Sequence, residues 1–469
     1  MQTVLALDLG TSSIRAALFD NQARIIPGSL AQLHGTPTTA PDGKAELDPA
    51  DVLHRTQKCL NHALSKARRN PPATIGFSCL WHSLLAVDPS GNPLTPIYTW
   101  ADSRCKNFAA KLRSHHDEKT YHHLTGCMFH SSFWPAKLLW LNSTTKIPKK
   151  LTRWVSVAEF IQQKLTGSAT CSLSMASGTG LLDRHTLSWS PEALKLASLP
   201  PYLLNPISDT PSDLQGIPWF PAIGDGAASN LGSGATCPGW AAINFGTSAA
   251  IRIALHQTPP SIPFGLFCYR IDSHRSLLGG ATSNAGNLHA WCLANLALPH
   301  SPNQIENILA SRLEPLHNLL VLPSWNAERA PDWNENSTGT IHGLTPATSA
   351  ADILQAISEA TLYRIAKIAN LLGPTRKIIL SGGILKSPSA TQRLADVLGR
   401  PVTPCREPEA SLRGAAVFAW QCLGHQPPPP EFQPPVKPVA RRTRLHNQKR
   451  AAAESLAAQL TAPALKADK

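Results

Sequence analysis

The chain has 469 residues, of which 42% are hydrophobic and 16% charged, so its composition is globular and excludes a disordered protein. This length exceeds what a single hydrophobic core supports, and we expect two domains. The formal net charge of +13 suggests nucleic acid, but part of the excess lies in "KPVARRTRLHNQKR" and no nucleic-acid-binding motif is present, so nucleic acid is not expected as a partner.

The cysteines and the first residues indicate a reducing compartment. The 10 cysteines are scattered singly, without the C-x-x-C pairs typical of zinc or redox sites. The chain starts in an apolar stretch, without the basic segment and cleavage site of a secretory signal. No apolar run reaches the roughly 18 residues of a membrane span. We therefore expect a cytoplasmic protein with free thiols and no membrane partner.

The opening stretch "VLALDLGTSSIRAALFD" predicts two strands, residues 4–9 and 14–19, around a turn of glycine and hydroxyl residues. The next segment, "DPADVLHRTQKCLNHALSKA", has apolar residues at helical spacing and predicts a helix. It is followed by "ATIGFSCLWHSLLAVDPSGNPL", which predicts further strands with a turn at residues 89–92. This alternation of strands and helices indicates the α/β class.

From about Cys237 the opening pattern starts again. The stretch "WAAINFGTSAAIRIAL" repeats the strand, the Gly-Thr-Ser turn and the second strand. One copy alone would be interpreted as an ordinary hairpin, whereas the matched pair favours two phosphate-binding turns.

The second half of the chain also contains a long helix and a glycine pair. Ser349 and Asp352 predict a capping box before "DILQAISEATLYRIAKIANLL", whose apolar residues line one face of a helix. The short strand "KIIL" then leads into "SGGILKSP", where Gly382 and Gly383 let the backbone approach a ligand closely.

After Cys422 the composition changes. The segment "HQPPPPEFQPPVKPV" cannot form a core and predicts an extended polyproline conformation. Beyond it, "KRAAAESLAAQL" predicts a helix with little to bury. We expect the folded protein to end near residue 424, followed by a poorly ordered, dispensable, proline-rich basic tail at 425–469.

Five motifs in a fixed order resemble the FGGY carbohydrate kinases, members of the actin-like, ribonuclease-H-like ATPase superfamily: "LDLGTSSIR", "AIGDGAASNLGSG", "NFGTSAAIR", "LSGGILKSP" and "EASLRGAA". The resemblance extends from residue 3 to about 424. It implies a sugar-binding domain at residues 1–236 and a nucleotide-binding domain at 237–424, with a nucleotide and sugar cleft between them. Within this family the likeness is greatest to gluconate kinases, through "GFSCLWHSLLAVDPSGNPLTPIYTWADSR", "TGCMFHSSFWPAKLLWL" and "SLSMASGTGLLD".

Phosphoryl transfer needs phosphate-positioning amides, a carboxylate for the metal and a base for the acceptor hydroxyl. Asp8, at the end of a buried strand, suits Mg²⁺ held together with ATP, although turn amides could equally satisfy a structural aspartate. The two turns would present amides and hydroxyls to the phosphates through Gly10, Thr11, Ser12, Gly246, Thr247 and Ser248.

Asp225 lies between two glycines in "IGDGAASN", where it could take the proton of an acceptor hydroxyl or simply cap the following helix. The resemblance assigns it as the catalytic base, also in contact with the substrate. The turn at Gly382 and Gly383 is predicted to hold the adenine. The segment "EASLRGAA" is predicted to support that pocket by close helix packing through its small residues.

For the sugar, the resemblance aligns Trp81 and His82 with the family's substrate-contacting pair. Asp102 and Arg104 follow in "TWADSR". A sugar acid would need a cation for its carboxylate, and Arg104 or His130 are the candidates. A structural histidine, and a plain ion pair between Asp102 and Arg104, are the alternatives.

These observations predict ATP-dependent phosphorylation of a small sugar or sugar acid, first of all D-gluconate to 6-phosphogluconate, with ATP and Mg²⁺ as cofactors. One alternative is another substrate of the family, such as xylulose or a related ketopentose. An alternative of a different class is a non-catalytic, actin-like nucleotide-binding protein. The sequence leaves a homodimer open.

Overall fold

The computed structural model describes residues 2–67, 70–145, 152–326 and 328–461. The chain forms two compact units, each built from three separate segments. The first unit comprises Met1–Trp240, Arg252–Gly279 and Glu407–Glu431, and the second comprises Ala241–Ile251, Gly280–Arg406 and Phe432–Lys469. This division differs from the contiguous domains 1–236 and 237–424 that the sequence predicts, because segments late in the chain pack with early ones. Within the described residues, no helix has the length and apolar character that crossing a membrane requires.

A sheet of the first unit has the order β12-β13-β6-β1-β2-β3, with β14 also paired to β6. Strand β1 (Val4–Leu9) pairs antiparallel with β2 (Ser13–Phe19), as the opening stretch predicts, and parallel with β6 (Ile75–Cys79). Strand β14 (Ile223–Gly224) also runs parallel to β6. The carboxyl ends of β1, β6 and β14 therefore meet at one edge of the sheet.

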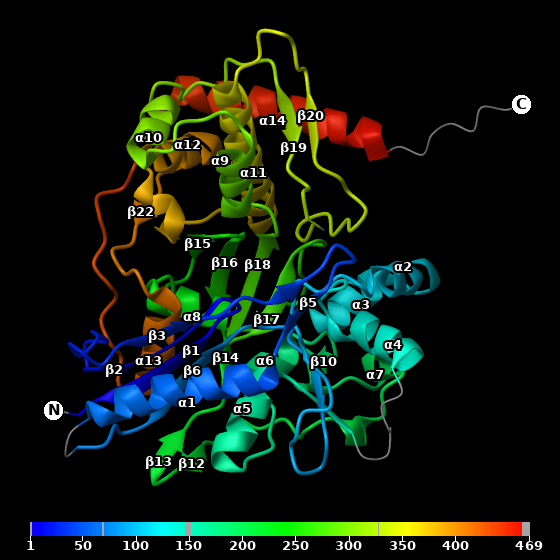
Figure 1. Cartoon of the computed structure of the whole chain (residues 1–469), viewed down its shortest axis with the longest axis vertical. Coiled ribbons are helices and arrows are strands. Elements are labelled where there is room, and N and C mark those ends of the chain that lie inside the picture. The colour runs from blue at the N-terminus through cyan, green and yellow to red at the C-terminus, as the bar shows by residue number, and fades with distance from the viewer. Residues whose placement is uncertain (1, 68–69, 146–151, 327, 462–469) are drawn as a thin grey trace, which may run out of the picture. The chain divides into compact units, whose positions relative to one another are not determined.

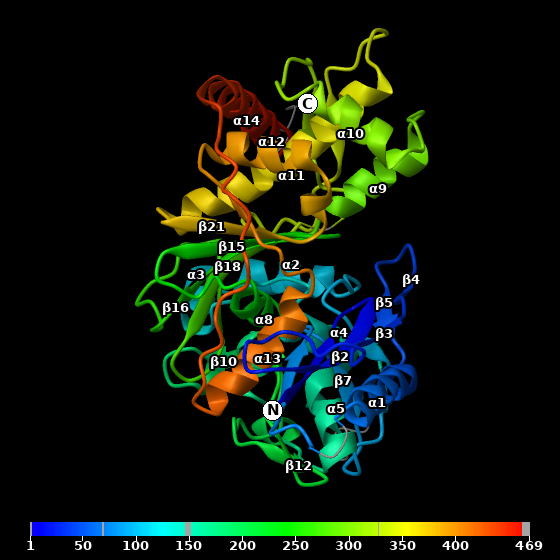
Figure 2. The same cartoon turned by 90° about the vertical axis from the view of Figure 1, so that its left-hand side faces the viewer.

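Two helices cover this sheet. Successive strand residues face opposite sides, and the face with Val4, Ala6, Ala17 and Phe19 packs on α13 (Ala410–Cys422). Helix α1 (Pro49–Ser65) packs on the other side, where Cys59 contacts the Ile14 carbonyl. Figure 2 shows α1 in blue and α13 in orange beside the strands of this unit.

Helix α13 also packs against α8 (Asp225–Gly232) at backbone contact distance. A Cβ atom added at Gly232 would lie 1.8 Å from the Ala410 carbonyl oxygen. One added at Gly414 would lie 1.8 Å from the Ala228 carbonyl oxygen. The close helix packing predicted for "EASLRGAA" is present, and its partner is α8 of the first unit. This contact fixes the helix that begins at Asp225.

The first unit contains many shorter elements. They are β3 (Ala31–His34), β4 (Thr38–Thr39), β5 (Ala45–Leu47), β7 (Leu85–Val87), β8 (Ile97–Tyr98), α2 (Lys106–His115), α3 (Glu118–Thr125), α4 (Trp134–Thr144), β9 (Arg153–Val155), α5 (Val157–Thr166), α6 (Leu173–Ser177), β10 (Leu182–Asp183), β11 (Ser188–Trp189), α7 (Pro191–Leu196), a 3-10 turn (Pro201–Leu203), β12 (Ser212–Leu214), β13 (Ile217–Trp219) and β17 (Phe267–Arg270).

A second sheet has the order β17-β18-β16-β15-β21-β22. Its further strands are β15 (Trp240–Phe245), β16 (Ala249–Leu255), β18 (Ser276–Thr282), β21 (Lys377–Ser381) and β22 (Thr403–Pro404). The boundary between the units falls inside β16 and β18. The other elements of the second unit are α9 (Gly286–Asn295), α10 (Pro302–Ala310), β19 (Leu320–Leu322), β20 (Thr340–His342), α11 (Ala350–Leu372), a 3-10 turn (Gly383–Lys386), α12 (Pro388–Leu398) and α14 (Ala440–Thr461).

Helix α11 begins with the predicted capping box. The Ser349 hydroxyl accepts a hydrogen bond from the Asp352 amide at 3.2 Å, and the Asp352 carboxylate accepts one from the Ser349 amide at 2.8 Å. The buried face of α11 contributes Leu354, Ile357 and Ala360 to a core shared with residues of α9, α10 and β19.

The sequence predicts that the folded protein ends near residue 424, but the structure continues beyond it. Phe432 and Val436 form β-bridges with Cys405 and Val402 in the second unit. Helix α14, red in Figure 1, follows and buries His446 to 1% exposure. The composition gave no sign of this, because the segment attaches through backbone bridges and a few buried side chains of a largely polar helix.

Candidate active site

The parallel strands of the first unit bring three polar residues to one edge of the sheet. Asp8 on β1 lies directly opposite Ser78 on β6, and Ser78 lies opposite Ile223 on β14. Helix α8 begins at Asp225, immediately after β14. The carboxyl edge of parallel strands is where α/β folds usually bind ligands, so the predicted metal and base residues both lie at a suitable edge.

Asp8 is buried and is held by two donors. Its Oδ1 accepts a hydrogen bond from Ser78 Oγ at 2.7 Å, and its Oδ2 accepts one from Arg15 Nη1 at 3.2 Å. Arg15 Nε also forms an ion pair with Glu409 at 3.1 Å. Burial raises the pKa of Asp8 to about 6; Ser78 and Arg15 oppose this rise, and the carboxylates of Asp225 and Glu409 add to it.

This electrostatic setting fits a hydrated magnesium ion. Within the described residues, no three histidine, cysteine or acidic side chains gather closely enough to enclose a metal. Mg²⁺ usually keeps several waters and takes one or two carboxylates together with substrate phosphates. A bound cation would offset the burial and the neighbouring carboxylates that disfavour the ionised form of Asp8. Its role as the metal carboxylate stays a prediction.

Both Gly-Thr-Ser stretches form tight turns between strands. The Gly10 amide donates to the Ser13 carbonyl at 2.9 Å, and the Gly246 amide donates to the Ser248 carbonyl at 2.9 Å. The second turn is also held by the start of α9, because the Gly286 amide donates to the Gly246 carbonyl at 3.0 Å. The turns are therefore hairpins in structure, which leaves phosphate binding by their remaining groups as a prediction.

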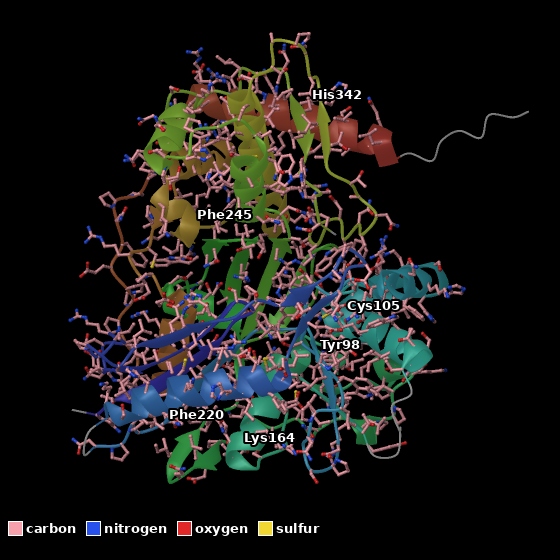
Figure 3. The ribbon with its side chains drawn as sticks, in the orientation of Figure 1. Tyr98, Cys105, Lys164, Phe220, Phe245 and His342 are labelled. Carbon is pink, nitrogen blue, oxygen red and sulfur yellow. The ribbon has the colours of Figure 1, made fainter. Side chains whose placement is uncertain are left out.

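The predicted adenine loop lies beside the second turn in the second unit. Gly382 has a φ of +94°, and a Cβ there would lie 2.6 Å from the carbonyl oxygen of Phe245, the last residue of β15, labelled in Figure 3. The Asn244 side chain donates to Ser381 Oγ at 3.2 Å. The structure thus brings the turn at 246–248 and the loop at 382–383 together at the ends of adjacent strands.

Around Asp225, glycines make room for an indole ring. A Cβ at Gly224 would lie 1.8 Å from Trp81 Cε2, and one at Gly226 would lie 2.8 Å from Trp81 Cζ3. The indole is only 5% exposed and donates to the Ser174 carbonyl at 2.9 Å. Trp81 therefore supports the backbone on both sides of Asp225. The helix N-cap is Gly224 and makes no side-chain cap bond, so Asp225 is not itself the cap.

His82 adopts a strained backbone and joins an aromatic group. Its φ is +66°, and its Nδ1 lies 2.5 Å from the Gly178 carbonyl oxygen. Its ring packs edge-on against Phe133 and Tyr269, with centroids 5.0 Å and 5.5 Å away. Tyr269 also packs edge-on against Trp81 at 4.9 Å. Sugar sites often have an apolar wall of this kind, and substrate contact by Trp81 and His82 stays a prediction.

His130 is linked to the first turn through Trp100. The His130 ring lies 3.1 Å from Ser132 Oγ, which donates to the Trp100 carbonyl at 2.9 Å. The Trp100 indole donates to Thr11 Oγ1 at 3.2 Å. This chain of contacts connects a predicted substrate residue with a predicted phosphate-binding residue inside the first unit.

Asp102 and Arg104 form the ion pair that the sequence left as an alternative. Arg104 Nη2 lies 2.5 Å from carboxylate oxygens of both Asp102 and Glu46. Its guanidinium also lies over the ring of Trp140 at 4.6 Å and near Tyr98, labelled in Figure 3, at 5.6 Å. Two carboxylates therefore already compensate the positive charge that was predicted to meet a substrate carboxylate.

Sequence reasoning missed several residues at this site. Ser78 contacts Asp8 through strand register, and Glu409 pairs with Arg15 through the return of a late segment; neither arrangement leaves a local pattern. Arg15 and Arg252 had a usable signal, because both Gly-Thr-Ser turns are followed within a few residues by Ile-Arg. The duplication could therefore have identified two cations as well as two turns.

Comparison with known proteins identifies a family. The model of the N-terminal domain of the FGGY family of carbohydrate kinases matches residues 3–215, and that of the C-terminal domain matches residues 241–421. The gluconokinase of Bacillus subtilis (strain 168) is 27% identical over 456 residues, which cover 90% of this chain and 88% of the relative. A glycerol kinase of Methylobacterium radiotolerans is 26% identical over 450 residues, covering 90% of this chain and 89% of the relative.

Solved structures agree on the fold. A gluconate kinase from Lactobacillus acidophilus superposes with a TM-score of 0.90 at 24% identity, covering 98% of both chains. A ligand-bound xylulose kinase from the same organism also has a TM-score of 0.90 at 24% identity, covering 98% of this chain and 99% of its own.

Proposed function

The chain belongs to the FGGY family of carbohydrate kinases, which use ATP as phosphate donor, and we propose that its acceptor is a sugar acid, D-gluconate. The enzyme class accordingly excludes the non-catalytic alternative that the sequence left open. The similarity to gluconokinases over 90% of the chain supports gluconate. A ketopentose such as xylulose is the second candidate, because a xylulose kinase has the same fold.

The observation that carries the proposed chemistry is the position of Asp225. It stands at the first turn of α8, at the same sheet edge as Asp8, with Trp81 packed against the glycines on either side. Fixed backbone on both sides holds a carboxylate in place without a long, flexible side chain. A general base needs this positioning before its pKa matters.

In the proposed reaction, Asp225 accepts the proton of the acceptor's hydroxyl. The hydroxyl oxygen forms a bond to the γ-phosphorus of ATP, and the bond from that phosphorus to the bridging oxygen breaks. ADP leaves with the electron pair of that bond, and the phosphorylated sugar acid remains. In the second unit, the amides and hydroxyls at 246–248 are proposed to bind phosphate and the neighbouring loop at 382–383 to receive the adenine; in the first unit, the turn at 10–12 is proposed to bind phosphate.

Asp8 is the residue that would hold Mg²⁺. When bound, the metal neutralises charge on the transferred phosphates. Arg15 and Ser78 orient the Asp8 carboxylate through their hydrogen bonds. The aromatic rings of Trp81, His82 and Tyr269 exclude water from one side of the acceptor.

A substrate panel tests the proposal. The full-length protein with ATP and Mg²⁺ is assayed by coupled detection of ADP on D-gluconate, D-xylulose and glycerol at matched concentrations. We expect turnover of gluconate well above the other two. Strong turnover of xylulose with none of gluconate would overturn the proposed acceptor and favour the second candidate.

A further inference from the structure

Arg252, on strand β16, carries a guanidinium group with unfilled donors. Its Nε and Nη1 are buried and have no hydrogen-bond partner, although the residue as a whole is partly exposed. Within the described residues no carboxylate forms an ion pair with it. A buried donor without an acceptor is costly, and a buried charge more so. The side chain is therefore suited to an anion that the protein itself does not supply.

The neighbours of Arg252 place it at the candidate active site. A Cβ at Gly226, the residue after Asp225, would lie 2.9 Å from Arg252 Nε and 2.8 Å from the Trp81 ring. Burial lowers the pKa of Arg252, and the nearby charge of Asp225 and the hydroxyl of Tyr269 oppose this fall. The missing side chain at position 226 is what leaves room for this arginine beside the base.

Other cations at the site are already compensated. Arg15 pairs with Asp8 and Glu409, and Arg104 pairs with Asp102 and Glu46. Both have acceptors within the first unit, so neither needs an anion from a substrate. Arg252 differs from them in this respect.

Its place along β16 indicates which anion it meets. Four residues of extended chain, about 13 Å, separate Ser248 of the predicted phosphate turn from Arg252. Ala250 lies on the same face of the strand as Arg252, two residues earlier, and its side chain is only a methyl group. Within the first unit, Arg252 lies next to the proposed base and the rings of Trp81 and Tyr269, the part of the proposed site that receives the acceptor.

We propose that Arg252 binds the carboxylate of the acceptor and is the residue by which the enzyme selects sugar acids over neutral sugars and polyols. The inference rests on the proposed function and names Arg252 as the residue that recognises the carboxylate of the sugar acid. Gly226 is part of the same arrangement, because a side chain there would meet both the Trp81 ring and the guanidinium.

The test compares D-gluconate with D-glucitol, in which a hydroxymethyl group replaces the carboxylate on an otherwise identical carbon chain. The ratio of kcat/KM for the two acceptors is measured in the wild type, Arg252→Met and Arg252→Lys. Because a charge-assisted hydrogen bond to a carboxylate is lost, we expect Arg252→Met to lower the ratio about 10- to 100-fold, mainly through the KM for gluconate. Arg252→Lys, which keeps the charge, should fall between.

Gly226→Ala provides a second route to the same result. The added methyl group would meet both Trp81 Cζ3 at 2.8 Å and Arg252 Nε at 2.9 Å. Displacement of the guanidinium should lower the ratio, whereas displacement of the indole beside Asp225 should lower kcat for both acceptors alike. Thermal unfolding and calorimetric binding of ATP in each variant separate loss of selectivity from loss of folding.

The outcomes separate this inference from the proposed acceptor. An unchanged ratio with equally reduced kcat for both acceptors would overturn the role of Arg252, whatever the substrate. If the wild type prefers a different sugar acid, the ratio test on that acid and its polyol still supports Arg252 while gluconate is rejected. A wild type that uses only neutral acceptors overturns both.

Discussion

Ser78 Oγ donates a 2.7 Å hydrogen bond to Asp8 Oδ1 across two parallel strands whose residues 8 and 78 stand directly opposite each other. This bond and the contact from Arg15 only partly offset the burial that raises the pKa of Asp8 to about 6. The protein therefore carries, at the edge of its first sheet, a carboxylate whose ionised form is costly in the absence of a bound cation.

Asp8→Asn should stabilise the metal-free protein at neutral pH while abolishing catalysis. The folded-state pKa of about 6 exceeds the ordinary 3.8, so the folded state binds the proton more tightly and loses stability as the pH rises through this window. We expect a gain of up to about 3 kcal/mol near pH 7, shrinking to nothing near pH 4. Urea unfolding across this pH range measures it, with exposed Asp42→Asn as control. Lower stability of Asp8→Asn at neutral pH would contradict the prediction.

Asp225→Asn should remove the base and leave the site otherwise in place. Because the amide keeps nearly the same shape but cannot accept the proton, we expect kcat to fall about 10²- to 10⁴-fold. Calorimetric binding of ATP and of gluconate should stay within a few-fold of the wild type. Turnover at the wild-type rate would show that another group takes the proton.

Gly414→Ala should destabilise the first unit, because its methyl group has no room against the Ala228 carbonyl. Inserting a carbon into such a contact costs about 1–3 kcal/mol. The measurement is the free energy of unfolding in urea. Ser411→Ala, a partly exposed position on the same helix, is the matched control and should change little. Equal stability of the two variants would mean that α13 and α8 can move apart without loss of unfolding free energy.

Arg442→Ala should show that the C-terminal helix contributes to stability. Arg442 Nε lies 2.6 Å from Asp396, whose side chain is fully buried. Removing this donor weakens the compensation of a buried carboxylate, and we expect a loss of about 1–3 kcal/mol. Arg441→Ala is the matched control, since that side chain is 70% exposed and its pair with Glu314 should contribute at most about 1 kcal/mol. Thermal or urea unfolding measures both variants. Equal losses of stability in Arg442→Ala and Arg441→Ala would indicate that α14 is a dispensable tail.

Local patterns in the sequence predicted the elements that carry the proposed chemistry. The repeated Gly-Thr-Ser turn predicted two hairpins. The position of Asp8 near the end of β1 made it the predicted metal residue, and the resemblance made Asp225 the predicted base. The capping box at Ser349 also followed from neighbouring residues alone. These features depend on a few consecutive side chains, which is why periodicity and turn chemistry find them.

The features that were missed depend on partners far away in the chain. Glu409 pairs with Arg15, almost 400 residues away in the chain. Phe432 and Val436 attach to the second unit by backbone bridges, which a proline-rich composition does not predict. The compensation of Arg104 by Glu46 and the unfilled donors of Arg252 are likewise visible only once distant residues are placed. Whether a charged side chain is compensated depends on residues that are distant in the chain, so it cannot be predicted from local sequence patterns as secondary structure can.

The interleaving of the two units has a consequence for how the protein is made. One face of the sheet that contains strands β1 and β2 is covered by α13, which is synthesised more than 380 residues after these strands. Contacts of such long sequence separation form slowly and leave apolar surface uncovered in the meantime. The nascent chain therefore exposes Val4, Ala6 and Phe19 until α13 has been synthesised, and we expect this kinase to depend most on chaperones during that interval.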